Sequence, residues 1–77
     1  MKEKMKELIA ETLKDLRLQK RLTQTELSKL CNVDTSTIVR YEKNNVTMQI
    51  DTIAKIIEPF DIDIFIFFKE IIAKTQK

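Results

Sequence analysis

The chain has 77 residues, so it forms one domain at most and its hydrophobic core is small. It contains no histidine and a single cysteine, Cys31, which excludes an intrachain disulfide and a Cys/His metal site. We therefore expect no metal and no cofactor, and we expect self-association to supply buried surface that so short a chain lacks. The formal net charge of +2 is too small to identify a partner.

The charge is unevenly distributed. Residues 1–45 contain ten Lys and Arg against seven Asp and Glu, whereas residues 46–77 contain four against five. A basic N-terminal part is compatible with a phosphate-facing surface, and ordinary solvated helix faces explain it about as well. No apolar run is long enough for a transmembrane helix, and the charged start from Met1 to Glu11 is unlike a signal peptide. With its lone thiol, the chain is expected in the cytoplasm, without a membrane partner.

The first helix is predicted from about Lys2 to Lys20, where apolar residues recur with helical spacing: Met5, Leu8, Ile9, Leu13 and Leu16. Thr23 to Glu26 then has the pattern of a capping box. In this motif the Thr23 hydroxyl accepts from the Glu26 amide, and the Glu26 carboxylate accepts from the Thr23 amide. A second helix follows to about Leu30, with Leu27 and Leu30 on its inner face.

The segment from Cys31 to Val33 interrupts the helical pattern. Asn32 is the residue there that best tolerates a left-handed backbone, which would end the helix and turn the chain. Asp34 has the character of an N-cap for a third helix, from about Thr35 to Glu42. The inward residues of that helix are Ile38 and Tyr41. Cys31 is expected to be a small buried apolar residue.

After a loop at Lys43 to Asn45, a fourth helix is predicted to start near Gln49 or Ile50 and to end around Pro59. Its buried residues are expected to be Ile50, Ile53, Ile56 and Ile57. The segment from Phe60 to Ile72 is ambiguous, because it alternates like a strand at first and is then rich in strand formers. A helix capped by Asp63 would place four apolar residues on one side, namely Ile64, Phe68, Ile71 and Ile72. We favour the helix, so residues 1–77 are predicted to form one all-α domain, a compact bundle of five helices.

Two short helices joined by a three-residue turn describe a helix-turn-helix. In addition to this general motif, the residues from Leu22 to Glu42 resemble one particular family, the lambda-repressor-like family, also called the XRE or Cro/repressor-type helix-turn-helix. The family pattern contains Leu-Ser/Thr-Gln, then Glu-Leu-Ala, a small turn, a Ser/Thr-rich recognition helix and a closing Glu. Here Ser28 replaces the alanine, and Asn32 and Asn44 stand where glycine is common. The resemblance covers about residues 13–65 and implies a transcription regulator that binds specific double-stranded DNA, not an enzyme.

The resemblance also implies roles for individual residues. The positions that face base edges are Thr35, Ser36 and Arg40. Arg40 is the strongest candidate, because a guanidinium pairs with both acceptors of guanine. Phosphate contacts are implied for Gln24, Thr37, Lys43 and Asn44. Arg17 and Glu42 correspond to an ion pair that ties the first helix to the recognition helix. The ordinary alternatives are that the charged residues are solvated and that Ser36 and Thr37 simply favour a first helical turn.

Residues 60–77 hold more apolar side chains than one small core can hide: Phe60, Ile62, Phe65, Ile66, Phe67, Phe68 and Ile72. Members of this fold usually act in pairs on palindromic operators, so we expect an isologous homodimer through this segment. The ending from Phe67 to Ile72 is similar to the controller proteins of restriction–modification systems. Phage repressors and plasmid or transposon regulators are close rivals.

A different class of function stays open, namely an antitoxin or adaptor whose main partner is a protein. Antitoxins often append a long toxin-binding tail, whereas only Ala73 to Lys77 follow the apolar segment here. Catalysis is not expected, because the sequence has no histidine, no phosphate-binding loop and no evident pair of carboxylates in a pocket.

Overall fold

The computed structural model describes residues 3–75, which form five α-helices and no strand. The helices are α1 (Glu3–Gln19), α2 (Gln24–Cys31), α3 (Thr35–Lys43), α4 (Ile50–Ile57) and α5 (Ile64–Thr75), with a 3-10 turn η1 (Glu58–Phe60) after α4. The predicted all-α bundle of five helices is therefore confirmed, and the ambiguous segment is helical from Ile64 onward. Within residues 3–75, no helix is both long and apolar enough to cross a membrane.

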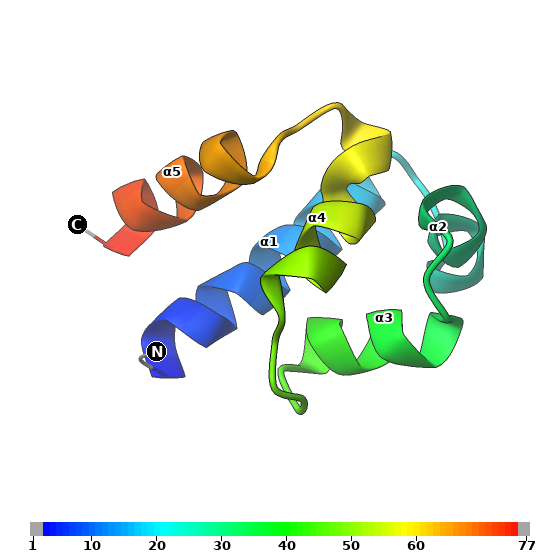
Figure 1. Ribbon diagram of the computed structural model, residues 1–77, viewed down its shortest axis with the longest axis horizontal. Helices are drawn as coiled ribbons and strands as arrows, with labels where there is room; N and C mark the ends of the chain where they lie inside the picture. Colours follow the sequence, from blue (N-terminus) through cyan, green and yellow to red (C-terminus); the bar gives the residue numbers. More distant parts are fainter. Residues whose placement is uncertain (1–2, 76–77) are drawn as a thin grey trace.

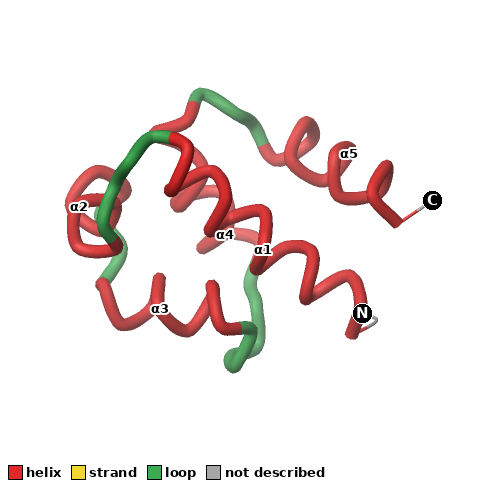
Figure 2. Tube along the Cα trace, turned by 180° about the vertical axis from the view of Figure 1, so that it is seen from behind, coloured by secondary structure: helices red, strands yellow, loops and turns green. Residues whose placement is uncertain are grey.

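The helices α1 and α4 lie in the middle of the molecule, and the other three helices pack on two different sides of them. The pair α2 and α3 lies at one end of the molecule, whereas α5 lies on the other side, packed on α1 and α4 (Figure 1). The reverse view shows the same separation, with α5 joined to the rest by a loop after η1 (Figure 2). The helix-turn-helix segment and the apolar C-terminal helix are thus presented on different parts of the surface.

The chain turns between helices without any glycine. Within residues 3–75, four residues adopt a left-handed backbone: Arg21, Asn32, Asn44 and Asp61, each with φ of 57° or 58°. Asn32 ends α2 in this conformation, as predicted, and its amide donates to the carbonyl of Ser28. Asparagine and aspartate tolerate this region better than other non-glycine residues. Arg21 has no such advantage, so the turn between α1 and α2 carries a local conformational cost.

The helices α2, α3 and α5 start where the sequence predicts, and a side-chain cap is present in two of these three cases. The capping box is confirmed, with the Glu26 amide donating to Thr23 Oγ1 at 3.0 Å and the Thr23 amide donating to Glu26 Oε1 at 2.8 Å. Asp63 caps α5, because its Oδ1 accepts from the amide of Ile66 at 2.9 Å. Asp34 is the N-cap residue of α3, as predicted, and has a non-helical backbone, but its side chain makes no capping bond within the described residues.

One core joins all five helices. Its fully buried members come from each of them and are Ile9, Leu13, Leu27, Cys31, Ile38, Tyr41, Ile53, Ile56, Ile57, Phe67 and Ile71. Cys31 is buried as expected, and this burial raises the pKa of its thiol above the ordinary value. The thiol therefore stays protonated and packs as a small apolar group.

Two predicted core residues are on the surface instead. Leu30 is 60% exposed, because the two-turn helix α2 buries a single narrow stripe, occupied by Leu27 and Cys31. Ile50 is 63% exposed, because it is the first residue of α4 and lies beyond the part of the helix that buries Ile53. The apolar spacing of both residues is compatible with burial, but the core is too small to cover either side chain.

The apolar residues of the C-terminal segment fall into three groups, which are buried, half-buried and exposed. Phe67 is only 1% exposed and packs in the core, so its predicted place in a dimer interface is wrong. Three others are half-buried and pack against the core of their own chain, namely Phe60, Ile62 and Phe68. Phe65, Ile66 and Ile72 remain exposed.

Replacing Phe67 by alanine should destabilise the protein by about 3–5 kcal/mol, because the substitution leaves a cavity between α5 and the other helices. Urea unfolding followed by circular dichroism measures this loss. The matched control is Leu30→Ala on the exposed side of α2, which should change the free energy of unfolding by about 0.5 kcal/mol or less. Similar losses in the two variants would contradict the burial of Phe67.

Candidate nucleic-acid interface

Hydrogen bonds fix α2 and α3 relative to each other. The Thr35 hydroxyl, at the start of α3, donates to Ser28 Oγ of α2 at 3.0 Å, and Ser28 Oγ donates onward to the carbonyl of Thr25 at 2.6 Å. In the turn between the helices, the amide of Val33 also donates to the carbonyl of Ser28, at 3.2 Å. These bonds make α2, the turn and α3 one unit.

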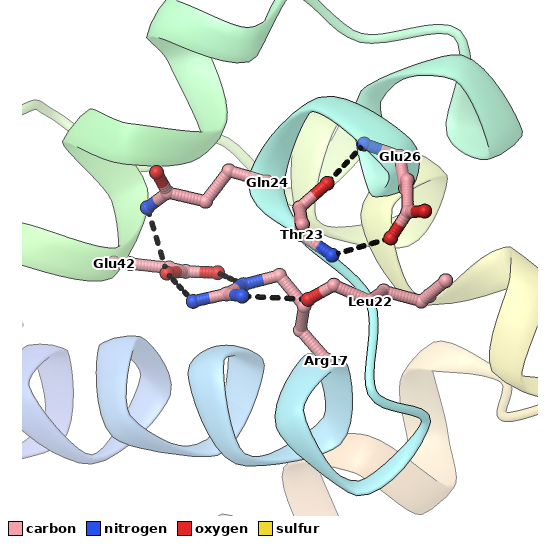
Figure 3. Close-up of polar contacts among 6 residues, drawn as sticks. All are labelled: Arg17, Leu22, Thr23, Gln24, Glu26 and Glu42. Atoms are coloured by element: carbon pink, nitrogen blue, oxygen red, sulfur yellow. Dashed lines mark hydrogen bonds and ion pairs between the residues drawn. The ribbon is translucent and has the colours of Figure 1, made fainter.

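The residues Arg17 and Glu42 form a two-pronged ion pair between α1 and α3 (Figure 3). Arg17 Nε lies 2.8 Å from Glu42 Oε2, and Arg17 Nη2 lies 3.0 Å from Glu42 Oε1. The third nitrogen, Nη1, donates to the carbonyl of Leu22 at 2.7 Å. The two side chains are only 10% and 4% exposed. The pair implied by the family resemblance is therefore present, and it also holds the segment that leads into α2.

Gln24 joins the same network from the first turn of α2. Its Nε2 donates to Glu42 Oε1 at 3.1 Å, so the Glu42 carboxylate accepts from both α1 and α2 (Figure 3). One N–H of the Gln24 amide is used in this bond, and the second is available for an acceptor such as a phosphate oxygen. The orientation of Gln24 is thus set by the ion pair.

A small hollow beside this network carries positive charge. It is lined by Lys14, Arg17, Thr23, Gln24, Glu42 and Lys43. The two lysines and the N-terminus of α2 suit an approaching anion. Sequence reasoning missed Lys14. The available signal was its position three residues before Arg17, which places both on one side of α1.

The outward side of α3 carries Ser36, Arg40 and Lys43, which are all exposed. At 100° per residue these three positions lie within about 60° of one another around the helix. Thr35 lies about 140° from Arg40 on the same count. It is half-buried and bonded to Ser28. The expectation that Thr35 shares this face is therefore wrong, because its hydroxyl joins the two helices. Thr37 is half-buried at the other edge.

The end of α3 is held by backbone and side-chain bonds. The hydroxyl of Tyr41 accepts from the amide of Gln49 at 3.0 Å, which ties the following loop to α3. Asn44 caps the helix with its left-handed backbone, and its Oδ1 is buried without a hydrogen-bond partner in the described part of the chain. A phosphate only accepts hydrogen bonds from protein groups, so the phosphate contact implied for Asn44 would have to use Nδ2.

Arg17→Met should destabilise the protein by about 3–5 kcal/mol, because it leaves the Glu42 carboxylate buried without its cation. The double variant Arg17→Met/Glu42→Leu should regain much of that loss, since no uncompensated charge stays inside. Denaturant unfolding of the two single variants and the double variant measures this coupling. If the two single losses simply added in the double variant, the pair would not be energetically coupled.

Comparison with known proteins agrees with this arrangement. Residues 13–67 match the helix-turn-helix family. Similar solved structures include the wild-type restriction–modification controller protein C.Esp1396I, with a TM-score of 0.82 at 25% identity, covering 95% of this chain and 94% of that one. A point mutant of that controller has a TM-score of 0.84 at 25% identity, covering 100% of this chain and 98% of that one.

A further similar structure is that of C.Esp1396I bound to a 25 base pair operator site, with a TM-score of 0.80 at 25% identity, covering 95% of this chain and 96% of that one. No curated protein matches this chain by sequence. The helix-turn-helix match spans well over half of the chain and includes α2, the turn and α3. This protein therefore belongs to the XRE-type helix-turn-helix family of DNA-binding regulators.

Proposed function

We propose that this protein is a transcription regulator that binds a specific palindromic operator as a homodimer, in the role of a restriction–modification controller. The observation that carries the proposal is the two-sided character of α3. Its outward face is polar and exposed at Ser36, Arg40 and Lys43. Its inner side is held to α1 and α2 through Glu42. A helix that is fixed on one side and free on the other can enter a major groove as a rigid body.

The exposed groups match the chemistry of duplex DNA. Arg40 would pair with the two acceptors on the major-groove edge of guanine, and Ser36 would contact a neighbouring base. Lys43 and the free N–H of Gln24 would contact phosphates on either side of the groove, with Thr37 and Asn44 as further candidates. The similarity to a controller whose structure contains its operator DNA supports this docking.

The proposed dimer uses the apolar surface of α5. A groove there is lined by Ile50, Ile64, Phe65, Phe68, Lys69 and Ile72, and it continues past Met5 and Met48. Phe65, at its edge, is 82% exposed. In an isologous pair, each Phe65 would enter the groove of the other protomer. Because α5 lies apart from α3, this contact would leave both recognition helices free for half-sites about 34 Å apart (Figure 1).

Arg40→Ala should weaken operator binding by about 1–3 kcal/mol and relax the preference at one base pair, because the bidentate contact to guanine is lost. Gln24→Ala should weaken binding to all sequences alike, because it removes a phosphate contact. Selection from random duplexes, followed by gel-shift titrations over a salt series, measures both effects. Lys55→Ala on α4 is the charge-matched control and should keep the full base preference.

The affinity of the wild-type protein should fall steeply with salt, as expected for about 6–10 neutralised phosphates per dimer. Unchanged base preference in Arg40→Ala would show that the assigned face of α3 is wrong. If no sequence were selected while the protein remained a dimer, an adaptor that binds another protein would be the better interpretation.

Sedimentation equilibrium at tens of micromolar should give twice the 9.1 kDa mass of one chain. Phe65→Glu should give a folded monomer, because this side chain contributes little to the core of its own chain and a charge opposes burial in an apolar groove. Leu30→Glu, on the exposed side of α2, is the matched control and should remain dimeric. A monomeric wild type, or a dimeric Phe65→Glu variant, would contradict this interface.

A further inference from the structure

Val39 is an apolar residue at the edge of the exposed face of α3. At 100° per residue it lies about 40° from Lys43 and about 60° from Ser36, and both of these are exposed. The other two aliphatic or aromatic residues of α3, Ile38 and Tyr41, are fully buried. Val39 is half-buried, so part of its side chain remains accessible beside the polar residues.

Core packing does not account for this valine. The larger half-buried apolar side chains elsewhere in residues 4–75 pack against the core, including Val33 and Val46, whereas Val39 is outside that set. Its neighbours three and four positions away are Thr35, Ser36, Glu42 and Lys43, of which Ser36 and Lys43 belong to the exposed face. A branched apolar group therefore stands among the polar residues of the surface proposed to meet DNA.

The major groove offers one apolar group to such a side chain. Thymine carries a C5-methyl there, whereas the other groups that bases display in this groove are hydrogen-bond donors and acceptors. Val39 and Arg40 are consecutive in α3, so their side chains point about 100° apart around the helix axis and reach different positions along the groove, where stacked base pairs are about 3.4 Å apart. Burying two methyl groups against each other removes apolar surface from water on both sides.

We propose that Val39 reads a thymine through its C5-methyl group, at the base pair next to the one that Arg40 reads. The inference rests on the proposed function, because it needs α3 to enter the major groove. It predicts that each half-site of the operator contains a T beside the G contacted by Arg40. Val39 is then a specificity-determining residue that acts by apolar contact, unlike the polar residues around it.

The test uses the full chain and the operator selected from random duplexes. Each thymine of one half-site is replaced in turn by deoxyuridine, which removes the methyl group and keeps base pairing. Wild-type affinity should fall about fourfold at one thymine, the value for one buried methyl-sized group. Val39→Ala should distinguish that uracil duplex from its thymine parent clearly less than fourfold, because alanine keeps only one methyl group, and it should keep its preference at the guanine assigned to Arg40.

Val33→Ala is the matched control, because Val33 lies in the turn and packs against the core. It should lower thermal stability while keeping the fourfold effect of the methyl group. Equal binding of wild type to all uracil duplexes, or an undiminished methyl effect in Val39→Ala, would overturn the role of Val39 and leave specific DNA binding intact. Failure to select any sequence would instead overturn the proposed function and this inference with it.

Discussion

The placement of the recognition helix depends on the buried ion pair between Arg17 and Glu42. Glu42 lies near the end of α3 and Arg17 near the end of α1, so the pair joins two helices that are distant in sequence. Two parallel contacts fix orientation as well as distance, which a single lysine ammonium could not do. The desolvation of two charges offsets much of their attraction, so the pair serves geometry more than stability.

The same pair also organises the groups that would contact phosphate. Arg17 holds the carbonyl of Leu22, the residue before the capping box, and Glu42 holds the amide of Gln24. The start of α2 is therefore positioned from two sides, with its first amides already oriented. Groups held in place before binding lose less conformational entropy when a ligand arrives. The side proposed to meet DNA is therefore held in position by the hydrogen-bond network of Arg17, Glu42 and Gln24 (Figure 3).

Because the core is small, the molecule has one polar and one apolar exposed surface. The helices α2 and α3 turn polar residues outward, while α5 leaves apolar residues uncovered beside the start of α4. Both surfaces depend on the same buried residues, because Phe67 and Ile71 of α5 join the cluster that contains Ile38 and Tyr41 of α3. Loss of α5 packing would therefore disturb the recognition helix as well as the proposed dimer.

The sequence by itself determined the features that depend on neighbouring residues. The capping box at Thr23, the left-handed turn at Asn32 and the cap at Asp63 each involve groups within a few positions of one another, so they could be predicted from local chemistry. The sequence predicted the first four helices for the same reason, whereas the apolar pattern from Phe60 to Ile72 fitted a strand as well as a helix. The ion pair between Arg17 and Glu42 was implied by the family resemblance, since no local pattern links residues so far apart.

Tertiary packing decided which apolar and polar residues face inward. Leu30 and Ile50 fit the predicted apolar faces of their helices and are exposed, whereas Phe67, outside the predicted apolar face of α5, is buried in a core of finite volume. The sequence does not distinguish Thr35 from Ser36, whereas in the structure α2 lies close enough for the Thr35 hydroxyl to donate a hydrogen bond to Ser28. Periodicity predicts a face for each helix, whereas the arrangement of the other helices determines how wide that face is and where it ends.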